Sequence, residues 1–347
     1  MRVAVTGATG FVGAHTTRAL VRHGHEVRAL VRDGERLVRA AADLGIDAPE
    51  AVVGDMADPR AVDELLAGCD AVVHAAAVVS LDRRRAGEMG AANPAGLRAV
   101  AGRAAALGLD PIVHVSSTSA LFRPGAGPLR TDLAVAAPSD PYARSKAASE
   151  AVARRLQGEG VPVAITYPSG ILGPSAGGAV GAATAGIARF VATGCIPTRD
   201  AALSVIDVRD LADVHARLLE PGRGPRRVMC GGHLVTMAHL AQVLRDLTGR
   251  RFPVLPVPAA ALRLAGRALD AVRRVAPVAF PLTADSMGLV TWWEGTDDAE
   301  REALGVGLRP LPETIGAALV ACVDAGVLAP RHVGRLAAST APTRGSG

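Results

Sequence analysis

Short apolar runs alternate with longer amphipathic segments along the first half of the chain. The apolar runs predict strands at Arg2–Thr6, Glu26–Val31, Ala51–Val53, Ala71–His74, Ile112–Ser116, Val163–Tyr167 and Arg227–Met229. The amphipathic segments predict helices at Gly13–His23, Pro59–Ala67, Pro94–Leu107 and Tyr142–Glu159. Continuously apolar strands between helices are typical of a parallel sheet that is buried on both faces. Right-handed connections then give an α/β fold with a doubly wound parallel sheet.

The regular alternation fades after Gly170, which predicts a second, smaller and mixed region. The stretch Gly173–Gly194 is rich in Gly and Ala, and Arg263–Val275 has the pattern of a basic amphipathic surface helix. The last residues, Ser339–Gly347, are small and polar, so we expect them to be disordered.

Composition narrows the class of protein. Of the 347 residues, 49% are hydrophobic, which excludes a disordered chain. Aromatic residues are only 3%, too few for the stacking platforms of single-stranded nucleic-acid binding. The net charge of +5 comes from basic residues spread along the chain, so we expect a solvated surface and no nucleic-acid partner.

The cysteines and the chain start indicate a reducing compartment. The four cysteines have no metal-ligand spacing, so we expect buried free thiols and no metal. The strand Arg2–Thr6 runs directly into a glycine loop and leaves no room for a signal peptide. The apolar stretch Ala71–Leu81 is too short to span a bilayer. We therefore expect a soluble, cytoplasmic protein without an integral membrane segment.

A glycine loop follows the first predicted strand and leads into a helix. Gly7, Gly10 and Gly13 have the spacing G-x-x-G-x-x-G. The first permits a tight turn, the second lets the backbone approach a pyrophosphate, and the third lets helix and sheet pack closely. The helix N-terminus favours the anion. The pattern predicts that a dinucleotide contacts Gly7, Thr9, Gly10, Phe11, Val12 and Gly13.

The end of the second strand favours NADP over NAD. An acidic residue there would bind the ribose 2′-hydroxyl of NAD, but the chain has Val31. Arg32 follows it, and a guanidinium suits a 2′-phosphate. Asp33 comes one residue too late to bind the ribose, so we expect it to point away.

Further cofactor contacts are expected where the third and fourth strands end. Asp55 and Met56 follow the third strand, where a carboxylate can accept from the adenine amino group. Ala75, Ala76 and Ala77 follow the fourth strand, and their small side chains let a cofactor lie against the strand ends. We interpret His74 as a core histidine with its hydrogen bonds satisfied, neither a ligand nor a base.

Tyr142 and Lys146 form the pattern Y-x-x-x-K at the start of a predicted helix. A spacing of four puts both side chains on one face. The lysine and a positively charged nicotinamide ring are expected to lower the pKa of the phenol, which could then exchange a proton with a carbonyl or alcohol oxygen. Lys146 is the single lysine of the chain, and Tyr142 is one of two tyrosines. A lone ammonium in an otherwise all-arginine basic set indicates a role that arginine cannot fill.

The third participant should orient the substrate oxygen through a hydroxyl. Four consecutive hydroxyl residues end the fifth strand, and Ser117 is our choice, with Thr118 as the alternative one position later. Asn93, on the preceding helix, is expected to position a water or a backbone carbonyl beside Lys146.

These residues together resemble the extended short-chain dehydrogenase/reductase family, the NAD(P)-dependent epimerase/dehydratase group. The resemblance spans roughly residues 1–325. It rests on the glycine loop, Gly54-Asp55, Ser116-Ser117, Tyr142 to Lys146, Tyr167 to Pro174, Val205 to Ala212, Leu304-Gly305 and Arg309-Pro310. It implies a Rossmann-type doubly wound parallel sheet with a smaller C-terminal α/β substrate domain, and a homodimer formed through a helix bundle. Within the Tyr167 to Pro174 motif, it adds Pro168 and Ile171 to the cofactor contacts.

The resemblance also divides the chain. Residues 1–172 and 203–230 are expected to form the NAD(P)-binding Rossmann domain. Residues 173–202 and 231–330 are expected to form the substrate-binding region, and 331–347 a disordered tail.

Within the family, the chain looks most like the branch of dihydroflavonol reductases, with the 3β-hydroxysteroid dehydrogenases close by. The Asp-Glu pair that follows the catalytic hydroxyl in sugar-nucleotide dehydratases is absent, and so is the acid that epimerases carry at Val31. The candidate substrate segment Ile171–Leu203 holds few charges. We expect an NADP(H)-dependent oxidoreductase that interconverts a ketone or aldehyde and its alcohol on a largely apolar small molecule. A nucleotide-sugar epimerase or dehydratase, and a non-catalytic dinucleotide sensor, remain alternatives.

Overall fold

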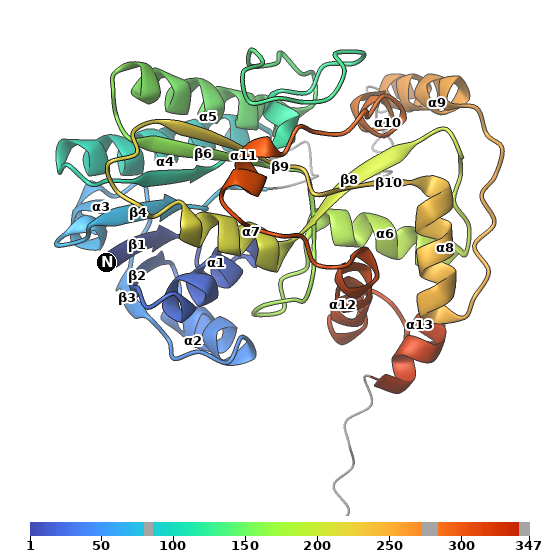
Figure 1. Ribbon diagram of the computed structural model, residues 1–347, viewed down its shortest axis with the longest axis horizontal. Coiled ribbons are helices and arrows are strands. Elements are labelled where there is room, and N and C mark those ends of the chain that lie inside the picture. Colours follow the sequence, from blue (N-terminus) through green and yellow to red (C-terminus); the bar gives the residue numbers. More distant parts are fainter. Residues whose placement is uncertain (80–85, 273–283, 340–347) are drawn as a thin grey trace, which may run out of the picture.

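The computed structural model describes residues 1–79, 86–272 and 284–339 (Figure 1). A seven-stranded sheet with strand order β3-β2-β1-β4-β5-β6-β9 forms its centre, and every pairing in that sheet is parallel. The strands are β1 (Arg2–Thr6), β2 (Glu26–Val31), β3 (Glu50–Val53), β4 (Ala71–His74), β5 (Ile112–Val115), β6 (Val163–Pro168) and β9 (Arg226–Cys230). The strand order reverses direction between β1 and β4, as in a doubly wound fold. The predicted Rossmann-type sheet is confirmed.

Helices cover both faces of this sheet (Figure 1). The helices α1 (Phe11–Arg22), α2 (Gly34–Asp43) and α7 (Val208–Arg217) lie on one face, and α3 (Pro59–Leu66), α4 (Ala86–Ala106) and α5 (Pro141–Gly158) lie on the other. Successive strand residues point to opposite faces, so Ile112 packs with the second group of helices and Val113 with the first. The core on each face is built almost entirely from Val, Leu, Ile and Ala, as the scarcity of aromatic residues requires.

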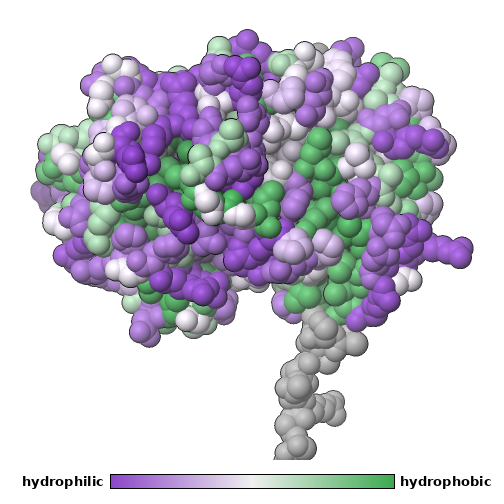
Figure 2. All heavy atoms as spheres, viewed as in Figure 1, coloured by the Kyte–Doolittle hydropathy of each residue, from purple (hydrophilic) through white to green (hydrophobic). Residues whose placement is uncertain are grey.

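A smaller sheet with strand order β10-β8-β7 lies beside the large one. Its strands are β7 (Gly170–Leu172), β8 (Ala202–Asp207) and β10 (His233–Thr236), and its helices are α6 (Ala182–Thr193), α8 (Met237–Thr248) and α12 (Leu311–Asp324). A third apolar cluster joins these helices to the sheet. The face shown in Figure 2 is mixed, with hydrophobic residues gathered in a band over the side of the small sheet.

The small sheet corrects the expected boundary between the domains. The expected Rossmann domain comprises residues 1–172 and 203–230, but β7 and β8 pair with each other in the small sheet. The chain therefore leaves the large sheet after Pro168 and returns with α7 and β9. Sequence pattern marks a strand as buried, but its pairing partner depends on contacts between distant segments.

The C-terminal region is ordered further than expected. The remaining elements are η2 (Thr118–Ala120), α9 (Ala259–Val272), α10 (Ala284–Thr291), α11 (Ala299–Ala303), α13 (Pro330–Val333) and η3 (Gly334–Ser339). The tail expected from residue 331 is wrong for 331–339, because Val333 is fully buried in the third apolar cluster. Residues 340–347 lie outside the described residues. The surface helix expected at Arg263–Val275 is observed as α9, and residues 273–275 also lie outside the described part.

Two further observations concern the expected compartment. All four cysteines are free, three of them buried and Cys195 partly exposed. Among the residues that the structure describes, no helix is both long and apolar enough to cross a bilayer.

Candidate active site

The glycine loop between β1 and α1 is pressed against the end of β4. Gly7 has a φ of +80°, and a Cβ placed on it would lie 2.8 Å from the backbone nitrogen of Ala76. A Cβ on Gly13 would lie 2.1 Å from the carbonyl oxygen of Gly7. The amide of Gly10 donates to the same carbonyl at 2.9 Å. Only glycine permits both the left-handed turn and the close approach of helix to loop.

The N-terminus of α1 has no side-chain cap. Gly10 is its N-cap residue, whereas α2, α3, α5 and α7 each begin with an aspartate that accepts from the first turn. The first amides of α1 are therefore available to an anion, and the helix dipole favours one. The loop and the open helix end fit the pyrophosphate of a dinucleotide.

Two of the residues predicted to contact a cofactor, Phe11 and Val12, have side chains that pack inside the protein. The ring of Phe11 meets the ring of His15 edge-on at a centroid distance of 5.8 Å. A Cβ on Gly181 would lie 2.8 Å from the Phe11 ring, so that ring packs tightly against the start of α6. Val12 packs against the apolar cluster beneath α1 and α7. Phe11 and Val12 thus offer a cofactor their backbone amides, while Thr9 is partly exposed at the tip of the loop.

The residues after β2 differ in their exposure and contacts. Val31 is buried at the strand end, and Arg32 is exposed beside it. Asp33 is the N-cap of α2, where its Oδ1 accepts from the amides of Glu35 at 2.9 Å and Arg36 at 3.3 Å. One oxygen of the Asp33 carboxylate is thus engaged by the first turn of α2.

Asp55 and Met56 follow β3 at the same edge of the sheet. Asp55 is exposed, and one of its oxygens accepts from the amide of Ala57 at 2.9 Å. Met56 reaches across to α4, where a Cβ on Gly96 would lie 2.5 Å from its sulfur. Met56 therefore packs against α4, and Asp55 keeps an accepting oxygen free for a ligand.

The turn after β4 is tied to β1 through Thr6. Its hydroxyl lies 2.9 Å from Nδ1 of His74 and 3.3 Å from the amide of Ala76. His74 stacks on His114 with ring centroids 5.8 Å apart. Burial lowers the pKa of His74 to about 3, so it is neutral. The interpretation of His74 as a satisfied core histidine agrees with this contact. Ala75, Ala76 and Ala77 are partly exposed beside it.

Tyr142 lies in the first turn of α5, and the Ser117 side chain is close enough to act on the pKa of its phenol. Burial raises the pKa of the Tyr142 phenol, Ser117 opposes that rise, and the charge of Asp140 adds to it. The expected effect of Lys146 was to lower this pKa; in the protein alone, desolvation has the largest influence and the charge of Asp140 acts in the same direction. The phenol is thus protonated at neutral pH, the state in which it can donate a proton.

Lys146 lies one turn further along the same face of α5. Its side chain is 7% exposed, and Nζ donates to the carbonyl oxygen of Val115 at 3.1 Å. Burial lowers the pKa of Lys146 to about 8, opposed by the charge of Glu150. The contact with Val115 fixes the ammonium at the end of β5, beside the hydroxyl residues that follow it.

The two candidate hydroxyls point in different directions. Ser117 accepts from the amide of Ser119 at 3.2 Å and from its hydroxyl at 2.9 Å, and it also meets Tyr142. The hydroxyl of Thr118 instead donates to the carbonyl oxygen of Pro168 at 3.2 Å. The geometry therefore brings Ser117, and not Thr118, to the proposed proton donor.

Asn93 connects three segments beneath this site. Its Oδ1 accepts from the amide of Val78 at 2.7 Å, and its Nδ2 donates to the carbonyl of Val78 at 3.0 Å and to Ser145 Oγ at 2.6 Å. Asn93 thus binds the backbone carbonyl of Val78, whereas Lys146 donates to the carbonyl of Val115. Because Ser145 precedes Lys146, Asn93 ties the turn after β4 to the helix that carries Tyr142 and Lys146.

The last two predicted cofactor contacts lie at the exit from the large sheet. Pro168 is buried at the end of β6, and Ile171 is partly exposed on β7, where it packs beside the cluster beneath α1 and α7. The predicted residues in the loops after β1 to β6 thus follow the carboxyl ends of these parallel strands, where parallel α/β folds bind ligands, whereas Ile171 lies in the small sheet.

Sequence reasoning missed the polar residues that hold this site together. Thr6, Ser119 and Ser145 each contact a predicted site residue directly, as described above. Glu150 is fully buried four residues after Lys146. A spacing of four after a catalytic lysine was the signal that could have pointed to Glu150.

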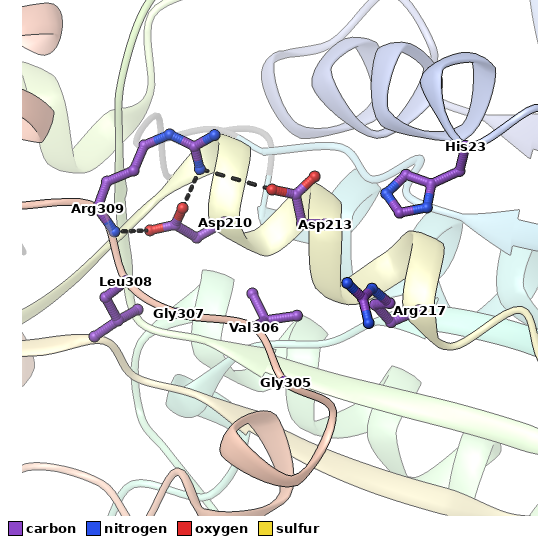
Figure 3. Close-up of a pocket in the computed structure, with 9 residues that line it drawn as sticks. All are labelled: His23, Asp210, Asp213, Arg217, Gly305, Val306, Gly307, Leu308 and Arg309. Atoms are coloured by element: carbon purple, nitrogen blue, oxygen red, sulfur yellow. Dashed lines mark hydrogen bonds and ion pairs between the residues drawn. The ribbon is translucent and has the colours of Figure 1, made fainter.

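A cavity of about 340 Å³ lies outside this cluster, between the end of α1, α7 and residues 305–309 (Figure 3). It is lined by His23, Asp210, Asp213, Arg217, Gly305, Val306, Gly307, Leu308 and Arg309. Arg309 forms an ion pair with Asp210 and donates its amide to the same carboxylate at 2.8 Å. Asp213 lies 3.7 Å from the guanidinium. None of the predicted site residues lines this cavity.

The fold and the site define a dinucleotide-binding α/β enzyme class, and sequence comparison identifies the family. Residues 3–231 match the model of the NAD dependent epimerase/dehydratase family. The chain belongs to this family, as the sequence predicted. Its members and relatives support an NAD(P)-dependent enzyme among the oxidoreductases, dehydratases and epimerases.

Individual relatives include reductases. The chain is 32% identical over 263 residues to sterol demethylase protein B of Methylococcus capsulatus, covering 74% of this chain and 78% of that protein. It is 31% identical over 268 residues to a putative dihydroflavonol 4-reductase of Synechocystis, covering 73% and 74%. Among solved structures, that of gox2253 matches with a TM-score of 0.77 and 25% identity, covering 94% of this chain and 98% of the other.

Proposed function

We propose that this protein is an NADP(H)-dependent oxidoreductase that interconverts a ketone or aldehyde and its alcohol on a largely apolar small molecule. The observation that carries the proposal is the contact between Tyr142 and Ser117, with the buried ammonium of Lys146 one turn away. The two hydroxyls can hold one carbonyl oxygen between them.

In this proposal, each residue has a separate task. Ser117 donates a hydrogen bond to the substrate oxygen and orients the carbonyl. Tyr142, whose phenol is protonated at neutral pH, transfers its proton to that oxygen as negative charge develops on it. Lys146 stabilises the phenolate that remains. The bound cofactor would supply the hydride.

The choice of NADP(H) rests on the end of β2. The side chain of Val31 cannot accept from a ribose hydroxyl, and one oxygen of Asp33 is engaged at the N-cap of α2. Arg32 is exposed beside them. A guanidinium at this place favours a 2′-phosphate through charge-assisted hydrogen bonds.

The proposal of an apolar substrate rests on the surroundings of Ser117. The ring of Phe122, soon after η2, stacks on Trp293 with centroids 5.9 Å apart. The indole of Trp293 donates to Ser204 Oγ on β8 at 2.6 Å, so this pair connects the catalytic side of the large sheet to the small sheet. The relatives named for sterol demethylation and dihydroflavonol reduction agree with an apolar carbonyl compound.

The test is an assay of NADPH oxidation over a panel of ketones, aldehydes and oxidised sterols, with Tyr142→Phe as the matched inactive control. The proposal expects turnover of at least one apolar carbonyl compound by the wild type and a loss of about 10²–10⁴-fold in the variant. Binding of NADPH should be the same in both. A variant with nearly full activity would exclude Tyr142 as proton donor.

A nucleotide-sugar epimerase or dehydratase is the second candidate, favoured by the family match over residues 3–231. Extraction of the purified protein separates the two: tightly held NAD and activity on nucleotide sugars would replace the reductase proposal. We further propose a homodimer through a helix bundle, which light scattering of the purified protein tests directly.

A further inference from the structure

A fully buried carboxylate lies one helical turn beyond the catalytic lysine. Glu150 has no exposed surface, and its position four residues after Lys146 places both on one face of α5. An ionised carboxylate is costly to bury unless it is paired and hydrogen-bonded. Its retention inside the protein therefore calls for identified partners.

Three side chains satisfy Glu150. Its Oε2 accepts from Ser116 Oγ at 2.7 Å, and its Oε1 accepts from the phenol of Tyr167 at 2.6 Å. Arg154 Nε donates to Oε1 at 2.6 Å, and the same guanidinium donates to the carbonyl of Leu133. The carboxylate is thus held by α5 itself, by the residue after β5 and by β6. It is a fixed charge, because its partners are themselves buried or anchored.

We propose that Glu150 is a positioning residue that keeps Lys146 in its ammonium form for the reaction described above. The inference rests on that proposed function for its catalytic meaning, but the interaction itself is a property of the protein alone. Its basis is the shared face of α5, the complete burial of the carboxylate and the three hydrogen bonds that hold it in place.

The other titratable groups around Lys146 cannot replace this charge. The charge of Lys146 acts on His74 on β4 and on His114 on β5, and burial lowers the pKa of His74 to about 3 and that of His114 well below its usual range. Both rings are therefore neutral near pH 7. Tyr142 is protonated and carries no charge. Among the described groups, Glu150 is the one whose charge favours the ammonium.

The groups that face Glu150 leave most of its stabilising effect on the Lys146 ammonium intact. Tyr167 on β6 keeps its proton, because burial and the carboxylate both raise its pKa. Ser116 is neutral. Arg154 carries a positive charge, but it lies two turns from Lys146 and is 16% exposed, so solvent screens it partly. Along α5, Glu150 lies one turn from Lys146, whereas Arg154, the counter-ion of Glu150, lies two turns from Lys146.

The test uses the single lysine of the chain. Protein labelled with ¹³C at the lysine Cε gives one lysine signal, whose shift against pH measures the pKa of Lys146 without substrate or cofactor. We expect a midpoint near 8 in the wild type. In Glu150→Gln the midpoint should fall by about one unit, because an opposite charge close by shifts a pKa by roughly that amount or more.

Tyr167→Phe is the matched control, because it removes one hydrogen bond from the same carboxylate and keeps the charge. Its midpoint should equal that of the wild type. An unchanged midpoint in folded Glu150→Gln, or an equal fall in Tyr167→Phe, would overturn the proposal. If Glu150→Gln does not fold, the double variant Glu150→Gln/Arg154→Met removes both charges together and leaves no unpaired one. A lower midpoint there supports the proposal, and an unchanged midpoint overturns it.

The experiment separates this inference from the proposed function. If no carbonyl compound is reduced by the wild type, the reductase proposal fails while the titration still measures the effect of Glu150. If reduction is found, the basic limb of the pH profile of turnover should move to lower pH in Glu150→Gln by the same amount as the midpoint. A limb that stays in place while the midpoint falls would show that the ammonium is not needed, and would overturn the catalytic part.

Discussion

The helices α1 and α5 both begin at the site, but their N-termini are capped in opposite ways. The N-terminus of α1 is Gly10, with no side chain to cap its amides. The N-terminus of α5 is closed by Asp140, which accepts from the amide of Ala143 at 2.9 Å. An open helix end attracts an anion through its backbone, whereas a closed one frees its first turn to present a side chain. The proposed cofactor end of the site is therefore built from backbone, and the proposed catalytic end from side chains.

Ser117→Ala tests the catalytic end most strongly. Removal of one hydrogen-bond donor to a developing oxyanion costs about 10²–10³-fold in turnover. Thr118→Ala is the control and should cost much less, because its hydroxyl is committed to Pro168. Turnover numbers of both variants on the same carbonyl substrate provide the measurement. A larger loss in Thr118→Ala would mean that the neighbouring hydroxyl is the one in use.

Lys146→Arg tests whether charge alone suffices at that end. The guanidinium keeps the positive charge but cannot occupy the position of Nζ beside Val115, and displacement of about 1 Å costs roughly 10²-fold. Arginine also stays protonated far above pH 8, so any basic limb that Lys146 causes should disappear. The pH profile of kcat shows both effects. Wild-type turnover in this variant would show that arginine can replace Lys146, and that the single lysine has no special role.

Gly13→Ala tests the backbone-built end. A Cβ at this position would lie 2.1 Å from a backbone oxygen that cannot move away, so we expect a loss of about 1–3 kcal/mol in the free energy of unfolding. Dinucleotide binding should weaken as well. Gly34→Ala in α2 is the control, because its Cβ would meet nothing within 4 Å. Urea unfolding and cofactor titration measure both. Equal stability of the two variants would contradict the close approach.

Arg32→Ala tests what the exposed side chain after β2 adds to the affinity for the cofactor. NADPH affinity should fall about tenfold, which corresponds to about 1.4 kcal/mol, while NADH affinity stays unchanged. Arg39→Ala on the exposed side of α2 is the control for a general change in charge. Equal losses for both cofactors would show that Arg32 does not bind the 2′-phosphate.

Asp140→Ala opens the end of α5 and makes it resemble α1. Loss of the cap should cost about 1 kcal/mol of stability. The pKa of Tyr142 should also fall, because the charge of Asp140 raises it. Asp140→Asn separates the two, because it keeps a capping oxygen without the charge. Thermal unfolding and the pH profile measure them. A pKa of Tyr142 that is unchanged in both variants would leave Asp140 with the cap alone.

Much of this molecule follows from local sequence. The predicted strands of the large sheet agree with the observed ones to within one residue at each end, because a buried parallel strand is a continuous apolar run. Gly7, Gly10, Gly13, Tyr142 and Lys146 were recognisable for the same reason: their chemistry depends on spacing within one loop or one helix face.

Only the tertiary structure decided which distant residues meet. It placed β7 and β8 in the small sheet, extended the fold through Val333, and turned Ser117 toward Tyr142 while Thr118 faces Pro168. It also buried Glu150 one helical turn beyond Lys146. Such pairings arise from packing between segments far apart in the chain, and burial then changes the charge state of each group, which spacing along the sequence cannot express.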